Sequence, residues 1–255
     1  MRHEVVVGYD SSRAGRAALT WAVREAKERL LDLTVCHAWS VPQPSVDRDL
    51  EHAARTTATN TLDEGALLAR QELPPLRVRP LLVRGPAGLV LARTSRDAAM
   101  LVVGTGGTVD LTGRGSVPAV SYTATHARCP VVLVRDAPLP KDGSVVVAVA
   151  GTPDLGALAF AYEHAAAAGA DLHVWGGCWP GPAGTALERR WFADSLARWR
   201  DKHPDVLVTV DLADQRPLAD RLNAVPDVRL IVVNSPACLE DALLSHRSAP
   251  VAVTR

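Results

Sequence analysis

The segment with the clearest potential for chemistry is a glycine-rich stretch that follows an apolar run ending at Val103. Five glycines lie between positions 104 and 115, and Ser116 then stands where it would cap a helix reaching to about Ala127. Glycines let backbone N–H groups converge on an anion, and the start of a helix adds a favourable potential. The stretch therefore predicts a phosphate site, although it lacks the Gly-Lys-Ser/Thr ending of a Walker A loop. The alternative is a surface turn without a ligand.

A carboxylate, Asp10, is the second candidate. It follows the first apolar run, residues 5–9, and so lies at the carboxyl end of the first predicted strand. Ligands of open α/β sheets bind at that edge, where a carboxylate can accept hydrogen bonds from a ribose or a base. The alternative is that Asp10 or Ser11 only caps the following helix.

The elements that must position these residues alternate along the chain. Short runs rich in Val, Leu and Ile are apolar throughout, which is typical of strands buried on both faces. Between them lie alanine-rich segments whose apolar residues share one helical face. We expect helices over 14–30, 50–73, 155–168 and 189–199. The alternation predicts an α/β fold with doubly wound, five-stranded parallel sheets and helices on both faces.

The second half of the chain repeats the first. The apolar runs that begin at residues 5, 32, 100 and 129 recur in the same order at 145, 171, 230 and 249, with a spacing that shrinks along the chain. Such a pattern indicates a duplication followed by deletions in the second copy. We predict two domains, 1–136 and 144–255, joined by a proline-containing linker at 137–143.

The second copy lacks the features that make the first a candidate phosphate site. Ala150 stands at the position of Asp10, and Asn234 and Ala237 stand at those of the first loop glycines. The loop itself is shorter, because 16 residues separate Val233 from Pro250 where 26 separate Val103 from Pro130. We expect a ligand in the first copy only.

Composition narrows the classes of partner. Lys plus Arg and Asp plus Glu both number 28, and a neutral chain has no electrostatic reason to bind nucleic acid or an acidic membrane surface. The four cysteines are far apart and form no C-x-x-C pair, which predicts reduced thiols. No signal peptide or membrane span is evident in the sequence, so we expect a cytoplasmic protein.

Taken together, these segments resemble a tandem universal stress protein, and the match covers nearly all of both copies. The run Val5–Ser12 is similar to the family's first strand with its acidic residue, 33–38 to its second strand, 104–116 to its phosphate loop and 129–134 to its closing strand. The resemblance implies two domains of the adenine nucleotide alpha hydrolase-like fold, packed with pseudo-twofold symmetry. The closing strands, 131–135 and 251–255, are the expected contact, and they could also form a homodimer.

The resemblance also implies site residues. ATP, with or without Mg²⁺, would be held in the first domain only, with Asp10 and the Ala38 backbone at the adenosine end. The phosphates would be held by the loop and the helix start, namely Gly104, Gly107, Gly115, Ser116 and Val117. Seven residues separate Gly107 from Gly115, two fewer than in the family's pattern.

Three functions follow as hypotheses. The first is a non-catalytic stress-response regulatory protein that binds an adenine nucleotide. The second is a protein–protein interaction module of the same fold without nucleotide, and the third is a weak ATP-hydrolysing enzyme. No residue stands out as a catalytic base, and we predict neither catalytic residues nor a metal site. His37 is interpreted as a structural residue on a buried strand, and Trp175 and Trp179 are candidates for lining an apolar pocket in the second copy.

Overall fold

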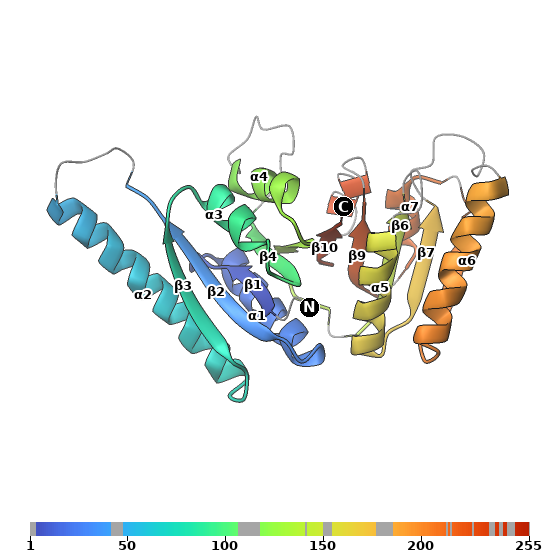
Figure 1. The fold of residues 1–255 in the computed structure, drawn as a ribbon, viewed down its shortest axis with the longest axis horizontal. Helices are drawn as coiled ribbons and strands as arrows, with labels where there is room; N and C mark the ends of the chain where they lie inside the picture. Colours follow the sequence, from blue (N-terminus) through green and yellow to red (C-terminus); the bar gives the residue numbers. More distant parts are fainter. Residues whose placement is uncertain are drawn as a thin grey trace. The chain divides into compact units, whose positions relative to one another are not determined.

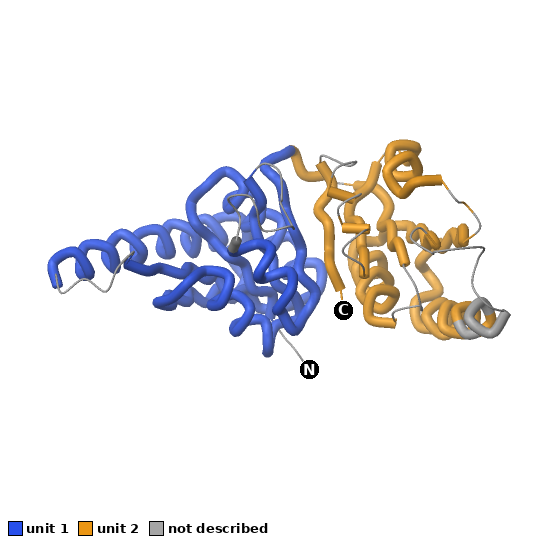
Figure 2. The backbone as a smooth tube through the Cα atoms, turned by 90° about the horizontal axis from the view of Figure 1, so that it is seen from above, with its two compact units in different colours: residues 1–137 blue, residues 138–255 orange. Residues whose placement is uncertain are grey.

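A computed structural model describes residues 4–41, 48–106, 118–140, 142–149, 155–176, 186–212, 214, 216–225, 227–234, 238–239, 242–243 and 248–254. The chain forms two compact units, residues 1–137 and 138–255, which Figure 2 distinguishes by colour. Each unit contributes five of the described strands, and neighbouring strands within a unit are parallel.

The first unit alternates strands and helices from β1 to β5 (Figure 1). Its elements are β1 (Glu4–Gly8), α1 (Arg13–Glu28), β2 (Asp32–Trp39), α2 (Arg48–Glu72), β3 (Val78–Arg84), α3 (Ala87–Thr94), β4 (Met100–Thr105), α4 (Pro118–His126) and β5 (Val131–Arg135). The strand order is β3-β2-β1-β4-β5, with neighbouring strands parallel. Helices α1 and α2 pack together on one face of the sheet, and α3 and α4 pack together on the other.

The second unit repeats this order. Its elements are β6 (Ser144–Val149), α5 (Leu155–Ala168), β7 (Leu172–Gly176), α6 (Ala186–Lys202), β8 (Val208–Asp211), α7 (Leu218–Asn223), β9 (Val228–Val233) and β10 (Val251–Val253). The strand order is β10-β9-β6-β7-β8, again with parallel neighbours. The predicted fold class, an α/β protein with doubly wound parallel sheets, is confirmed.

The apolar runs form the centres of both sheets. Residues Val5–Val7, Met100–Val102 and Val145–Val147 have no exposed surface, as expected of strands covered by helices on both faces. The outer strands β3 and β8 are more exposed. The outermost strands therefore tolerate charged residues. The central strands are rigidly packed.

The helices follow the sequence pattern closely. Trp21 of α1 is 1% exposed, which agrees with its place on the predicted core face.

The expectation of four reduced cysteines is wrong. Cys36 and Cys129 are free, whereas Cys238 is disulfide-bonded, so the chain does not carry four reduced thiols. Wide spacing along a sequence does not keep two cysteines apart in a fold, and this is why the pattern misled.

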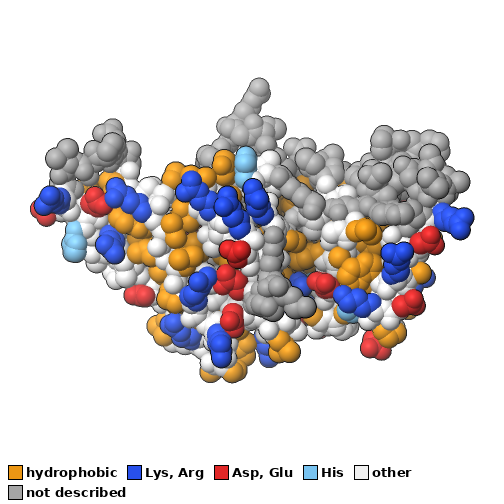
Figure 3. All heavy atoms as spheres, viewed as in Figure 1, with side chains coloured by type: hydrophobic (Ala, Val, Ile, Leu, Met, Phe, Trp, Pro, Cys, Tyr) orange, Lys and Arg blue, Asp and Glu red, His pale blue; other side chains and the backbone are white. Residues whose placement is uncertain are grey.

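The surface and the helices bear on the partner classes. Side chains of both charges are interspersed on the face drawn in Figure 3, as the equal numbers of acidic and basic residues would suggest. Among the described residues, no helix is both long enough and apolar enough to cross a membrane.

Candidate functional site

A cavity of about 130 Å³ lies in the first unit where three strands end. Gly8 of β1 is in register with Cys36 of β2 on one side and Val103 of β4 on the other, and all three line it. The chain leaves β1 toward β2 and β3 and later returns to β4 and β5, so this is the point where the direction of winding reverses. Open α/β sheets bind ligands at this switch point.

The walls of the cavity are mostly apolar, with a few polar groups among them. Helices α3 and α4 close it from one face of the sheet. Its lining comprises Gly8, Tyr9, Asp10, Cys36, His37, Ala38, Ala87, Leu91, Val103, Gly104, Ala119, Val120 and Thr123. An apolar pocket with a small number of convergent polar groups is the usual form of a small-molecule site.

Asp10 has two roles at the mouth of this cavity. It lines the cavity, and its Oδ1 accepts hydrogen bonds from the Ser12 backbone N–H at 3.1 Å and the Ser12 hydroxyl at 2.6 Å. Ser12 is the N-cap of α1, because its Oγ accepts from the Gly15 N–H at 3.0 Å. The structure therefore makes Ser12 the cap, in place of Asp10 or Ser11, and Asp10 orients the cap.

His37 and Tyr9 join the ends of β1 and β2 beside the cavity. The Tyr9 N–H donates to the Cys36 carbonyl at 2.9 Å, and His37 Nδ1 lies 2.6 Å from the Tyr9 carbonyl oxygen. A carbonyl oxygen only accepts, so Nδ1 carries the hydrogen of this bond. The predicted structural role of His37 agrees with this bond, but the residue also lines the cavity.

The Tyr9 side chain is anchored to the helices on the other face. Its hydroxyl donates to Glu64 Oε1 of α2 at 3.0 Å, and Arg16 of α1 binds the same oxygen at 2.8 Å. Burial, the largest effect, raises the pKa of Tyr9. A carbon placed on Gly65 would lie 2.6 Å from the Tyr9 ring, so a glycine is needed for this contact. The residue before Asp10 is thus held on both its backbone and its side chain.

Gly104 has a packing role that the sequence did not reveal. A Cβ atom at this position would lie 2.4 Å from the carbonyl carbon and oxygen of Ala14 and 2.7 Å from the backbone nitrogen of Gly15. Glycine is therefore required for the start of α1 to approach the end of β4. Two positions further on, a Cβ on Gly106 would meet nothing within 4 Å.

The structure brings together three of the seven predicted site residues. Asp10, Ala38 and Gly104 all line the cavity, whereas Gly107, Gly115, Ser116 and Val117 lie outside the described residues. Sequence reasoning missed the wall made by the helices, notably Leu91 of α3 together with Ala119 and Thr123 of α4. The sequence around Leu91 is apolar, as in any helix that packs in a core, and so it did not indicate a ligand site.

Cys36 is a buried thiol on the floor of the cavity. It is 1% exposed, and burial, the largest effect, raises its pKa to about 11. A thiol that is protonated near neutral pH is a poor nucleophile. The contribution of Cys36 to the cavity is instead its small side chain, which leaves room there. Within the described residues, no three His, Cys, Asp or Glu side chains are grouped so that they could hold a metal ion.

Fold and site together define a doubly wound α/β protein with a small-molecule cavity at the switch point of its first sheet. The sequence profile of the universal stress protein family matches residues 1–135. A universal stress protein of Mycobacterium tuberculosis is 30% identical over 256 residues, covering 91% of this chain and 86% of the relative. The chain therefore belongs to the universal stress protein family.

A solved structure of the family shares this fold. A universal stress protein from Archaeoglobus fulgidus superposes with a TM-score of 0.75 at 14% identity, covering 100% of this chain and 99% of its own. A family member from Arabidopsis thaliana was solved with AMP bound, and it covers 52% of this chain and 91% of its own at 16% identity and a TM-score of 0.39.

Proposed function

We propose that the first unit binds an adenine nucleotide, ATP in particular, and that the chain is a regulatory protein of the stress response without strong catalysis. The observation that carries the proposal is the cavity at the ends of β1, β2 and β4, with Asp10 at its mouth. Membership of the universal stress protein family supports it, since the ATP-binding pattern of that family places its acidic residue at the position of Asp10.

The size and polarity of the cavity suit the base end of a nucleotide. An engineered apolar cavity of about 150 Å³ binds benzene, so a volume of about 130 Å³ admits a flat ring but not a whole nucleotide. The apolar walls from Leu91, Val103 and Val120 would cover the faces of the base. The ribose and phosphates would then lie toward Asp10 and the glycine-rich stretch that begins at Gly104.

Asp10 can serve the ligand without giving up its role in the cap. Its two bonds to Ser12 are both made by Oδ1, so Oδ2 is the oxygen proposed to accept from a ribose hydroxyl. The backbone of Ala38, at the end of β2, would hold the other side of the adenosine. A nucleotide that bound better to one conformation of this edge than to another would shift the population and thereby a partner contact.

The second unit, in this proposal, is a degenerate domain of the same family that binds no nucleotide, with domain limits of 1–136 and 144–255. We propose the cytoplasm as the location, although the disulfide at Cys238 removes the cysteine pattern as an argument for it. Mg²⁺ would accompany the phosphates of ATP and is no separate site.

Two measurements test the proposal. The purified chain is denatured and the supernatant is searched for adenine nucleotides by mass spectrometry. Calorimetric titrations with adenosine, ADP, ATP and GTP then give the affinities. We expect adenine nucleotides to bind more tightly than GTP, and affinity to rise with phosphate number if the shortened loop and helix start still bind anions.

Variants of Asp10 separate ligand contact from fold. Asp10→Ala should weaken nucleotide binding by about 1–3 kcal/mol, whereas Asp97→Ala, on an exposed turn, should leave it unchanged. Asp10→Asn keeps an oxygen for Ser12 and loses the charge, so it should keep the stability of the wild type and lose part of the affinity. If no nucleotide binds to any of these proteins, the chain is an interaction module of the same fold. Steady release of ADP from ATP would instead support the weak enzyme.

A further inference from the structure

The second unit contains a buried guanidinium at the same edge of its sheet. Arg221 lies in α7, and its side chain is 2% exposed. An arginine is almost never buried unless its charge and hydrogen bonds are satisfied. The neighbours of Arg221 therefore need to be accounted for one by one.

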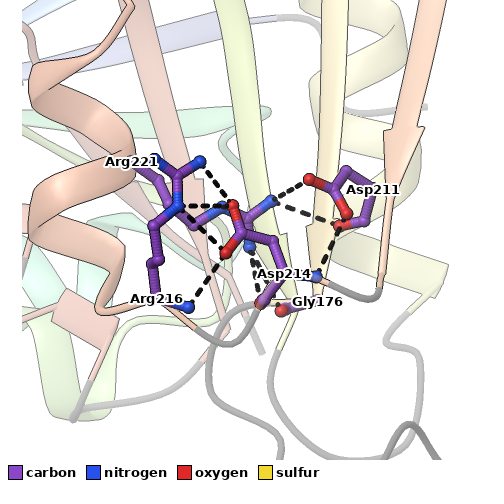
Figure 4. Close-up of polar contacts among 5 residues, drawn as sticks. All are labelled: Gly176, Asp211, Asp214, Arg216 and Arg221. Carbon is purple, nitrogen blue, oxygen red and sulfur yellow. Dashed lines mark hydrogen bonds and ion pairs between the residues drawn. The ribbon is translucent and has the colours of Figure 1, made fainter.

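Carboxylates and carbonyls surround the Arg221 guanidinium (Figure 4). Its Nε lies 3.3 Å from Asp214 Oδ2, and its Nη2 lies 3.4 Å from Asp211 Oδ2. Nη2 also donates to the Asp211 carbonyl at 3.2 Å, and Nη1 donates to the carbonyls of Gly176 at 3.3 Å and Asp214 at 3.4 Å. All three nitrogens of the planar group thus have acceptors.

An aromatic ring completes the surroundings of the guanidinium. The Arg221 Cζ atom lies 4.5 Å from the centroid of the Trp175 ring, within the range of a cation–π contact. Trp175 is 6% exposed and belongs to the end of β7. The guanidinium is therefore stacked on an indole and bordered by two carboxylates, and it is shielded from water.

The register of the two sheets identifies this position in the first unit. Ala148 of β6 pairs with Trp175 of β7 and with Val233 of β9. In the first sheet Gly8 pairs with Cys36 and with Val103, the three residues that floor the cavity. Trp175 thus stands where the first unit has Cys36.

The helices correspond in the same way. Both α3 and α7 begin after an N-terminal proline, and the carbonyl of that proline accepts a hydrogen bond from the residue four positions later. That residue is Val90 in α3 and Arg221 in α7. The second unit therefore has a large ring at the position of the thiol that lines the first unit's cavity. Its charged side chain stands at the position of Val90, which is not among the residues that line that cavity.

We propose that the Trp175 ring fills the second unit's counterpart of the first unit's cavity, and that Arg221 holds the ring in place by stacking on it. The indole occupies the space that a small residue leaves open in the first unit, and the guanidinium seals it against β7, β8 and the loop before α7. The missing loop removes the phosphate grip, and this internal pair removes the room for the base. The inference concerns the second unit alone and does not depend on nucleotide binding by the first.

The internal pair makes a prediction about small cations. Without the Arg221 side chain, the carboxylates of Asp211 and Asp214 and the ring of Trp175 remain as a site of the right charge and shape for a free guanidinium ion. The variant is Arg221→Ala and the probe is guanidinium chloride at low millimolar concentration, with potassium chloride as the ionic-strength control. Arg216→Ala is the matched control, because Arg216 also pairs with Asp214 but its side chain is 62% exposed.

The melting temperature of the full-length chain is the readout. Arg221→Ala should lower the transition of the second unit by about 10 °C, since it removes the buried donor of the Gly176, Asp211 and Asp214 carbonyls. Guanidinium should restore part of this loss in Arg221→Ala, while the wild type and Arg216→Ala should show no increase. Guanidinium that has no effect on Arg221→Ala, or destabilises it as it does the wild type, overturns the proposal.

A second variant keeps the proposal testable if Arg221→Ala does not fold. Trp175→Ala removes the ring and keeps the ionic contacts, so it should open an apolar space at the position of the first unit's cavity. Indole should then bind this variant and raise its melting temperature, with no such effect on the wild type. If indole gives the same shift in both proteins, the ring does not fill a cavity position and the proposal fails.

Discussion

The substitution Gly104→Ala separates the two explanations for the first glycine of the loop. If Gly104 serves only a phosphate, an added methyl group weakens nucleotide binding and leaves the fold intact. In the structure, however, the methyl carbon would lie 2.4 Å from the carbonyl carbon and oxygen of Ala14. We therefore expect the substitution to act first on the packing of α1 against β4.

The size of the effect follows from this geometry. Carbon atoms in contact are ordinarily separated by about 3.5–4.0 Å, so the helix start must move by roughly 1 Å or more. Overpacking of a well-packed core typically costs about 1–3 kcal/mol. The clashing atoms belong to the backbone and have no rotamer to escape into, so we expect the upper end, about 3 kcal/mol of unfolding free energy.

Gly106→Ala is the matched control within the same stretch of chain. Nothing lies within 4 Å of its added carbon, and Gly106 is not among the described glycines with a positive φ. Alanine should therefore be neutral or stabilise by up to about 1 kcal/mol through the unfolded chain. Two substitutions of identical chemistry, two residues apart, should differ in sign or by several kcal/mol.

Hydrogen exchange with mass spectrometry in a urea series is the suitable assay, because it reports the two units separately. Peptides from α1 and β4 should lose protection at lower urea in Gly104→Ala, and peptides from the second unit should be unchanged. Equal protection in the wild type and Gly104→Ala would refute the packing argument. A loss of nucleotide affinity without loss of protection would return Gly104 to a purely phosphate-binding role.

Three further predictions concern single contacts. Hydrogen bonds from Arg216 lower the pKa of Asp214 from its usual 3.8 to about 2. The stability contributed by this carboxylate is therefore present above about pH 4 and is lost as the pH falls toward 2. Asp214→Asn should flatten the acid dependence of the second unit's melting temperature. At pH 8, a thiol reagent should modify the partly exposed Cys129 much faster than the buried Cys36; equal rates would argue against the closed cavity floor. Ser12→Ala should cost about 1 kcal/mol, read from urea unfolding, since the N-cap bond to the first turn of α1 is lost; an unchanged midpoint would contradict the cap assignment.

Patterns that repeat along the chain could be read from the sequence. The valine runs of β1, β4, β6 and β9 are apolar on both faces, and only strands covered by helices on both sides bury such runs. The recurrence of these runs in the same order then predicts two sheets of the same topology. The place of Asp10 at the edge of the sheet, where it lines the cavity, was also predictable, because the end of a first parallel strand is fixed by where its apolar run stops.

Contacts between distant elements could not be read in this way. The roles of Leu91 and Thr123 as cavity walls depend on how α3 and α4 cross the sheet, which no local pattern specifies. The need for glycine at Gly104 depends on the approach of α1, about 90 residues earlier in the chain. The burial of Arg221 was equally hidden, since an arginine in a short helix ordinarily faces water.

A few side chains distinguish the two units at the carboxyl ends of their central strands. The backbone order and the register of the strands are the same in both, so the fold alone does not decide whether a ligand has room. At the strand position that pairs with Gly8 in the first unit and with Ala148 in the second, Cys36 leaves space for a cavity, whereas Trp175 does not. Arg221 is accommodated beside this ring because the carboxylates of Asp211 and Asp214 accompany it. If Trp175 fills the cavity position as proposed, the shorter loop and the large ring both act against a ligand in the second unit.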